Sequence, residues 1–299
     1  MPELLSDLAA SWRRDLRVAG KAARTITIYQ QSVRFFSDWL TAQGRPADLE
    51  QLTKASISAW IDDLHGRNAP NTVLTRYRGM RRFVRWLVKE GELAQDPMRN
   101  LEQPKANPAP VPVLTDDEIS ALFKTCQGSS FRDRRDHAIL RVLFDTGIRI
   151  SECAGLTVAD VDLSDGIDTL LVMGKGSRPR VVPFGAKTGR ALDRYLRIRR
   201  THKHAGEAKL WLGQRGGLTG YGITDVLEQR AAQAGVEGVH AHRFRHTFAH
   251  RWLASGGQER DLMRLTGWTS TAMLARYGSS AADERARDAH RRAALGDRL

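Results

Sequence analysis

Three short motifs in the second half of the chain contain side chains that could act on a phosphodiester. Arg149 lies in TGIRISECAGL, Lys175 lies between two glycines in MGKGSRPRVV, and His242 and Arg245 lie three residues apart in HAHRFRHTFAH. Guanidiniums can hold the non-bridging oxygens of a phosphate and stabilise transition-state charge, and a lysine can protonate a leaving alkoxide. Taken singly, these residues are also compatible with a surface arginine, a basic turn and a polar helix face.

A fourth motif, LTGWTSTAMLARYG, contains Trp268 and Tyr277. The tyrosine is compatible with a core aromatic at the end of a helix, or its hydroxyl could be a nucleophile. A phenol is a weak nucleophile at its unperturbed pKa of about 10, so it needs cationic surroundings or a nearby base. The other three motifs would supply both. Together, the four motifs favour a nucleophilic displacement at phosphorus.

The histidines of the third motif raise the question of a metal site. His242, His246 and His250 repeat every four residues, so they would share one face of a helix. No carboxylate or cysteine accompanies them at ligand spacing, and three histidines over two turns converge poorly on one ion. No acidic cluster suited to magnesium accompanies the four motifs, which argues against a two-metal nuclease. We therefore expect no metal and no other cofactor.

The composition indicates a polyanionic partner. The 299 residues include 47 Lys+Arg against 34 Asp+Glu, a formal net charge of +13, and both halves of the chain are basic. Nucleic acid or an acidic membrane surface would suit this charge, whereas an arginine-rich protein without such a partner is the alternative. No apolar run approaches the roughly 20 residues of a membrane span. We expect double-stranded DNA as the partner and no membrane association.

The cysteines and the N-terminus indicate the compartment. Cys126 and Cys153 are the only cysteines, too few for a disulfide framework. The first residues, MPELLSDLAASWRRDL, include early acidic side chains and no long apolar segment, unlike a secretory signal. We therefore expect a cytoplasmic protein associated with the nucleoid.

The first hundred residues predict helices only. The clearest apolar stripe, in NTVLTRYRGMRRFVRWLVKEG, consists of Val73, Tyr77, Met80, Val84 and Leu87. Gly91 follows the expected helix end. The other faces of this helix carry five arginines, Arg76, Arg78, Arg81, Arg82 and Arg85. Such a face can be merely solvated or can follow DNA phosphates, and we take these arginines as candidate DNA contacts.

A proline-rich segment separates two predicted domains. Four prolines between Pro104 and Pro112 suit an extended, semi-rigid linker. We predict a helical domain over residues 1–106, a linker over 107–113 and a second domain over 114–299.

The second domain is predicted to mix helices with a little β-structure. Thr115 and Glu118 predict a capping box at its first helix. Two apolar runs flank the glycine-rich basic loop of DTLLVMGKGSRPRVVPF, which predicts a β-hairpin. Most of the remaining sequence predicts helices. The expected fold class is therefore mainly α, with a helical N-terminal domain and a mixed α+β second domain that contains a small sheet.

In this order, the four motifs resemble those of the tyrosine recombinases of the phage-integrase and Xer type, over nearly the whole chain. TGIRISECAGL is similar to the first-arginine motif of that family, with Arg149 in the catalytic position and Glu152 in the acidic position beside it. GKGSRPRVVPF is similar to the hairpin motif, which implies the catalytic lysine role for Lys175. HAHRFRHTFAH is similar to the His-x-x-Arg-His motif, which implies catalytic roles for His242 and Arg245.

The resemblance continues through the histidine that follows and the final motif. His246 matches the histidine that commonly follows the second arginine. Tyr277 matches the nucleophile, nine residues after Trp268, where many members have histidine. An indole offers an N–H donor but cannot shuttle a proton, so any role of Trp268 is hydrogen bonding or packing beside the tyrosine.

The resemblance also implies a mechanism. Tyr277 would attack the scissile phosphate to give a 3′-phosphotyrosine and a free 5′-hydroxyl, and Arg149 and Arg245 would stabilise the phosphorane. Lys175 would act as general acid, and His242 as general base or hydrogen-bond partner. A 5′-hydroxyl of a partner strand would then resolve the intermediate, through a Holliday junction.

An assembly follows from the same resemblance. The helical first domain would be a core-binding domain that clamps DNA with the catalytic domain, without a further N-terminal arm-binding domain. A monomer in solution would form a homotetramer on two recombination sites. Basic residues beside the motifs are candidate DNA contacts: Arg178, Arg180 and Arg243. Integration, excision and resolution of a mobile element are all compatible roles. A type IB topoisomerase and a catalytically silent DNA-binding protein are the alternatives.

Overall fold

The computed structural model describes residues 3–106, 112–164, 167–174, 178–270, 274, 287 and 290–294. It divides into two compact units, Met1–Ala109 and Pro110–Leu299. The predicted fold class, mainly helical with a small antiparallel sheet, is confirmed. Among the described residues, no helix combines the length and the apolar character that crossing a membrane requires.

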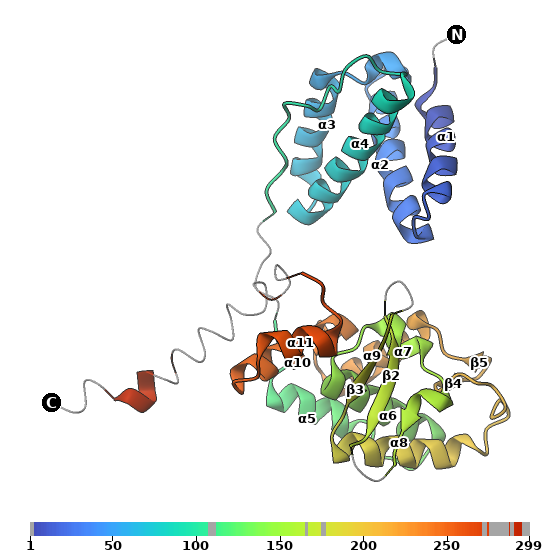
Figure 1. Cartoon of the computed structure of the whole chain (residues 1–299), viewed down its shortest axis with the longest axis vertical. Helices are drawn as coiled ribbons and strands as arrows, with labels where there is room; N and C mark the ends of the chain where they lie inside the picture. Colours follow the sequence, from blue (N-terminus) through green and yellow to red (C-terminus); the bar gives the residue numbers. More distant parts are fainter. Residues whose placement is uncertain are drawn as a thin grey trace. The chain divides into compact units, whose positions relative to one another are not determined.

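In its described part, the first unit is a set of helices around one apolar core (Figure 1). The helices are α1 (Leu5–Val18), α2 (Ala23–Ala42), the short 3-10 helix η1 (Leu49–Gln51), α3 (Lys54–Arg67) and α4 (Pro70–Glu90). The predicted stripe of α4 is fully buried at each of its five positions. Gly91 ends α4 as expected, in the left-handed conformation with φ 85°, because only glycine enters that region without a steric cost.

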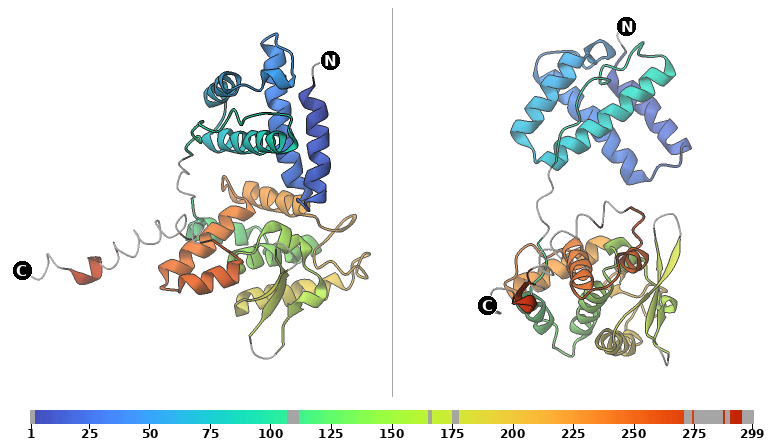
Figure 2. Two further views of the ribbon diagram at one scale, coloured as in Figure 1. Left: turned by 45° about the horizontal axis from the view of Figure 1, so that its top comes forward. Right: turned by 60° about the vertical axis from the view of Figure 1, so that its left-hand side comes forward.

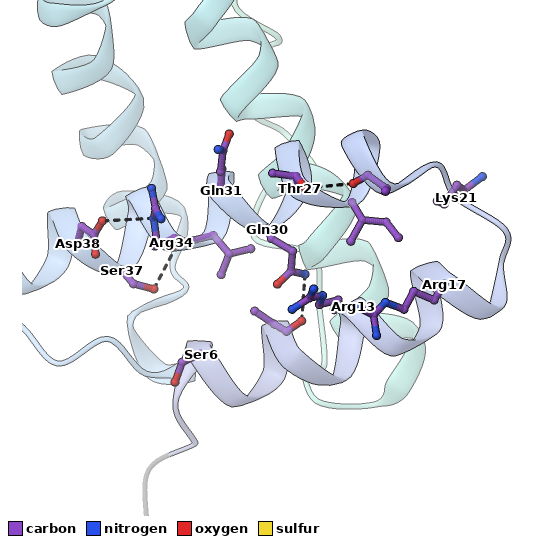
Figure 3. Close-up of a pocket in the computed structure, with 14 residues that line it drawn as sticks. Ser6, Arg13, Arg17, Lys21, Thr27, Gln30, Gln31, Arg34, Ser37 and Asp38 are labelled. Carbon is purple, nitrogen blue, oxygen red and sulfur yellow. Dashed lines mark hydrogen bonds and ion pairs between the residues drawn. The ribbon is translucent and has the colours of Figure 1, made fainter. Parts of the chain in front are cut away.

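The walls of a pocket of about 760 Å³ in the first unit come from α1 and α2 (Figure 3). Gln30 Nε2 of α2 donates a hydrogen bond of 3.0 Å to the carbonyl of Ala9 in α1, which joins the two walls. Arg13, Arg17 and Lys21 also line the pocket. This pocket is lined by residues of the first unit, whereas the four sequence motifs belong to the second unit.

In the second unit, a short antiparallel sheet lies at one side of a group of helices (Figure 2). Its helices are α5 (Asp116–Lys124), α6 (Phe131–Thr146), α7 (Ile150–Gly155), η2 (Val158–Asp160), α8 (Ala186–Arg199), α9 (Gly220–Ala234), α10 (Ala241–Ala254) and α11 (Glu259–Thr266). Its strands are β1 (Val161–Asp162), β2 (Thr169–Met173), β3 (Pro179–Pro183), β4 (Leu212–Gly213) and β5 (Gly216–Gly217). The capping box of Thr115 and Glu118 at the start of α5 is confirmed.

The predicted β-hairpin is formed by β2 and β3. The two strands pair antiparallel, from Thr169 opposite Pro183 to Met173 opposite Pro179, and β1 pairs with the other edge of β2. A hydrogen bond of 2.9 Å from Gly174 N to the carbonyl of Arg178 closes the strands at the turn. Gly174 and Arg178 are therefore the described residues on either side of the predicted lysine loop.

The end of α6 determines where the first motif lies. α6 packs against both α8 and α10, and Gly147 ends it with φ 57°. A Cβ at this position would come within 2.6 Å of the Phe248 ring of α10. Glycine is therefore required twice, for its conformation and for the close approach, and the chain turns there directly into Arg149 and α7.

Candidate active site

Glu152 joins the first motif to the hairpin. Arg149 is the N-cap of α7, and Glu152 is three residues into the helix. The Arg149 backbone N–H donates to Glu152 Oε2 and its Nη1 donates to Oε1, both at 2.8 Å. From β3, Arg180 donates to the same two oxygens through Nη1 at 3.0 Å and Nη2 at 2.7 Å. One carboxylate thus orients two arginines.

The carboxylate of Glu152 is held in its charged form. Its side chain is only 4% exposed, and burial alone would raise its pKa. The hydrogen bonds and charges of Arg180 and Arg149 outweigh burial, so the pKa of Glu152 lies below its usual value. The first motif and the hairpin are therefore joined by a buried ionic contact.

Arg245 approaches from α10. Its side chain is almost completely buried, at 2% exposure. Nη1 donates to the carbonyl of Gly147 and Nη2 to the carbonyl of Thr266, both at 2.7 Å. The guanidinium carbon lies 5.1 Å from the centre of the Trp268 ring, a cation–π distance. Arg245 is thereby fixed between the ends of α6 and α11.

The C-terminal end of α11 brings the three arginines together. The last carbonyls of a helix lack intrahelical partners and carry partial negative charge. Here the carbonyl of Leu265 accepts from Arg180 Nε at 2.8 Å. The Thr266 carbonyl accepts from Arg245, and more weakly from Arg149 at 3.5 Å. The Gly267 carbonyl accepts from Arg149 Nη2 at 3.4 Å.

These contacts make α11 the element that positions the arginines relative to one another. Gly267 ends the helix with φ 65°, which turns the chain toward Trp268. The structure therefore brings together Arg149, Glu152, Arg245 and Trp268, four of the residues that the sequence predicts for the site.

The histidines and the tryptophan of the motifs lie on and beside α10. His242 is exposed and His246 is buried, and their rings meet edge to face with centres 4.9 Å apart. Trp268 is 5% exposed and belongs to a small apolar cluster with Leu253, Leu262 and others. Trp268 thus packs between α10 and α11.

Two predicted site residues lie outside the described residues, Lys175 and Tyr277. Their neighbours in sequence are described: Gly174 and Arg178 flank the loop of Lys175. Leu274, close to Tyr277 in sequence, is buried in the same apolar cluster as Trp268. In the described part of the chain, no group of three or more histidine, cysteine, aspartate or glutamate side chains could hold a metal ion.

Two arginines predicted to contact DNA form ion pairs and hydrogen bonds within the second unit. Arg180 binds Glu152 and Leu265, as described above. Arg243 is 8% exposed, and its Nη2 donates to both carboxylate oxygens of Glu118 in α5, at 2.7 and 2.8 Å. We therefore replace the predicted DNA contacts of Arg180 and Arg243 with structural contacts within the unit. Arg178 is exposed.

The five arginines of α4 are likewise either exposed or in contact with other side chains of the first unit. Arg78, Arg82 and Arg85 are exposed. Arg76 instead lies over the Phe35 ring at 4.4 Å, and Arg81 Nη1 donates to the Tyr77 hydroxyl at 3.0 Å.

Strand alternation is the signal that could have identified the inward position of Arg180. Successive side chains of a strand point to opposite faces. In β3, Val182 is buried and Val181 exposed, so Arg180 shares the inner face. No comparable signal exists for the carbonyls of Thr266 and Gly267, because backbone groups carry no sequence identity. The sequence therefore did not predict that these two carbonyls accept hydrogen bonds from the site arginines.

Comparison with known proteins agrees with these features. Residues 112–284 match the phage integrase family, and residues 8–91 match the N-terminal SAM-like domain of phage integrases. The chain therefore belongs to the phage integrase family. Within that family it is a tyrosine recombinase of the Xer type, an enzyme that transfers DNA strands. The resemblance inferred from the four motifs is confirmed.

Individual relatives extend over most of the chain. A tyrosine recombinase XerC of Oceanobacillus iheyensis is 32% identical over 261 residues, which are 85% of this chain and 84% of that protein. A tyrosine recombinase XerD of Corynebacterium glutamicum is 32% identical over 305 residues, covering 96% of this chain and 98% of that protein. The crystal structure of XerH site-specific recombinase bound to palindromic difH substrate, a post-cleavage complex, is similar in fold. Its TM-score is 0.76 at 18% identity, over 95% of this chain and 84% of that one.

Proposed function

We propose that this recombinase cuts and rejoins duplex DNA at a short specific site through a 3′-phosphotyrosine on Tyr277 and a Holliday junction. The convergence of Arg149 and Arg245 on the end of α11 is the observation that carries the proposal. Both arginines of the resemblance meet at the segment that leads in sequence to the tyrosine. The similar XerH structure, a complex with its DNA substrate after cleavage, supports the same chemistry here.

The cleavage step forms one bond and breaks another. The Tyr277 hydroxyl oxygen bonds to the scissile phosphorus, and the bond from phosphorus to the 5′-oxygen breaks. His242 accepts the phenol proton, and Lys175 donates a proton to the leaving 5′-oxygen. A 5′-hydroxyl of the partner strand then attacks the phosphotyrosine in the reverse sense. Because each exchange replaces one phosphoester with another, no external energy source is needed.

The arginines stabilise the charge that develops on the non-bridging oxygens. Arg149 is the more accessible of the two, with 36% of its side chain exposed. Arg245 is held in one orientation by the carbonyls of Gly147 and Thr266. Donors fixed before the reaction need no reorganisation during it, which is where such groups contribute most to catalysis. Trp268 supports Arg245 by packing beneath its guanidinium.

DNA contacts beyond the site come from exposed arginines. Arg78, Arg82 and Arg85 lie at helical spacing along α4, so they form one basic face of the first unit. In the second unit, Arg178 adds an exposed basic side chain next to β3. Phosphate contacts of this kind fix position on the duplex without reading sequence.

The stoichiometry of strand exchange sets the size of the assembly. Recombination between two duplexes cuts four strands, and each chain supplies one Tyr277. Four protomers on two sites are therefore required, assembled from monomers that bind DNA in the cytoplasm, at the nucleoid. Integration, excision or resolution of a mobile element would each use this reaction.

Covalent capture tests the proposal. The protein is incubated with sheared DNA of the genome that encodes it, and detergent-resistant protein–DNA adducts are recovered and sequenced. A recovered site is then rebuilt as a duplex nicked beside the cleavage position, so that loss of the short 5′-hydroxyl fragment traps the adduct. We expect a phosphotyrosine at Tyr277. An adduct through another residue would contradict the proposal.

A further inference from the structure

Arg180 connects three segments of the second unit that are distant in sequence. It lies on β3, five residues after Lys175 and on the same hairpin. Its Nη1 and Nη2 engage both carboxylate oxygens of Glu152, and its Nε donates to the Leu265 carbonyl at 2.8 Å. With 13% of its side chain exposed, the guanidinium lies largely within the protein.

Arg180 and Arg149 bind the same two carboxylate oxygens of Glu152. Glu152 Oε1 accepts from Nη1 of both arginines, and Oε2 accepts from Arg180 Nη2 and from the backbone N–H of Arg149. A bidentate guanidinium–carboxylate pair fixes the plane of the carboxylate. That plane in turn sets the direction of the Arg149 side chain, because the same oxygen binds its guanidinium.

The charges of the cluster also indicate that Arg180 affects Arg149. Two guanidiniums share one buried carboxylate, so the cluster of Arg149, Glu152 and Arg180 has a net positive charge. Without Arg180, Arg149 would be the only cation hydrogen-bonded to Glu152 within the described residues. It would then be drawn toward that carboxylate, and its charge would be largely cancelled there.

The end of α11 shows that Arg180 occupies a fitted position. Gly267 has φ 65°, and a Cβ added there would lie 3.2 Å from Arg180 Nη1. The helix end is therefore packed against the guanidinium itself. Arg178, two residues earlier on the hairpin, is exposed instead.

We propose that Arg180 is a positioning residue for strand cleavage. It holds Glu152 so that Arg149 presents its guanidinium to a non-bridging oxygen of the scissile phosphate, and it fixes the lysine hairpin to the end of α11. This inference rests on the proposed function, because it assigns Arg180 a part in the same phosphoryl transfer. It does not place Arg180 in contact with DNA.

The test compares Arg180→Gln with the wild-type protein on two versions of one nicked duplex. In the first, the scissile linkage is an ordinary phosphodiester. In the second, a methylphosphonate replaces one charged non-bridging oxygen with a neutral methyl group. Tyr277 forms the same bond to phosphorus in both, and the same bond to the 5′-oxygen breaks. Only the need for a cation at that oxygen differs.

We expect Arg180→Gln to form the phosphodiester adduct about 100-fold more slowly, since a misplacement of about 1 Å can cost that much. On the methylphosphonate, the variant should be within a few-fold of the wild type. The ratio of the two rates within one preparation is independent of the fraction of folded protein. Arg180→Lys keeps the charge but not the fork, so it should fall between. Arg215→Gln is the matched control, because Arg215 is an exposed arginine in the turn between β4 and β5 with no part in the proposed site or DNA contacts, and it should keep the wild-type ratio.

Three results would overturn the inference. An equal defect of Arg180→Gln on both substrates would show that Arg180 does not act through Arg149. Rescue by a substrate with sulfur in place of the leaving 5′-oxygen, and not by the methylphosphonate, would assign its effect to Lys175 instead. A wild-type protein that forms no adduct on any substrate would contradict the proposed function itself, and this inference with it.

Discussion

Glu152 is a buried anion whose charge is kept by two arginines, and its pKa consequently lies below the usual value. A carboxyl group with a lowered pKa in the folded state stabilises the fold above its unfolded pKa, near 4.5. That contribution is lost as the pH falls through the folded value. The stability of the second unit should therefore depend on Glu152 at neutral pH and not in acid.

Glu152→Gln tests this dependence. At pH 7 we expect the variant to lose about 3 kcal/mol of unfolding free energy, because removing one partner of a buried ionic group leaves the others unpaired. As the pH falls below the folded pKa, the wild-type carboxyl becomes neutral and the difference between the two proteins should shrink. Urea unfolding at a series of pH values measures it. A difference that stays constant with pH would contradict the ionic role.

Helix ends are the elements that place the site. Gly147 at the end of α6 offers its carbonyl to Arg245, and Gly267 at the end of α11 offers its carbonyl to Arg149. Both glycines have positive φ. The precision of the arginines therefore comes from two helix terminations, each of which requires a residue without a side chain.

Gly147→Ala should cost more than a left-handed alanine alone. We expect a loss of about 1 kcal/mol from backbone strain and about 1–3 kcal/mol more from the clash with Phe248. Gly235→Ala, at the end of α9, is the matched control, because its φ is 66° and no atom lies within 4 Å of the added Cβ. Urea unfolding should show the larger loss for Gly147→Ala, together with slower adduct formation. Equal losses for the two variants would contradict the close packing of α6 on α10.

DNA binding by the exposed face of α4 can be tested with two adjacent arginines, Arg81 and Arg82. Arg82 is exposed, whereas Arg81 is bonded to the Tyr77 hydroxyl. We expect Arg82→Gln to reduce the slope of log K for duplex binding against log salt by about 1, as loss of one phosphate contact does. Arg81→Gln removes the same charge from the same helix and should leave the slope unchanged. Binding titrations at several salt concentrations measure both, and equal slopes for the two variants would argue against a DNA-facing α4.

Local patterns predicted much of the fold. The stripe of α4, the capping box of α5 and the β2–β3 hairpin follow from periodicity and capping chemistry over short windows. The partners of Arg180 and Arg243 did not follow, because Glu152 and Glu118 are distant in sequence and only tertiary packing brings them near. From the sequence of a DNA-binding enzyme, an arginine that contacts phosphate cannot be distinguished from one that is buried in an ion pair. The structure is needed to show which arginines are buried.

At the scale of the whole molecule, the proposed chemistry uses one nucleophile per chain, Tyr277, so recombination between two duplexes requires assembly. We expect a monomer of 33.4 kDa without DNA, and four chains with two duplexes when the recovered site is added to the Tyr277→Phe variant. Light scattering on the separated species measures the stoichiometry. Complexes that contain no more than two chains at saturating protein would contradict the assembly.

The proposed reaction requires Tyr277 as the nucleophile, and one measurement tests this most directly. Wild-type protein and Tyr277→Phe are mixed with the nicked duplex of the recovered site, and denaturing gels follow the covalent adduct. We predict an adduct for the wild type, on a peptide that contains Tyr277. We predict none for Tyr277→Phe, with duplex binding preserved within a few-fold. A covalent adduct formed by Tyr277→Phe would contradict the central claim.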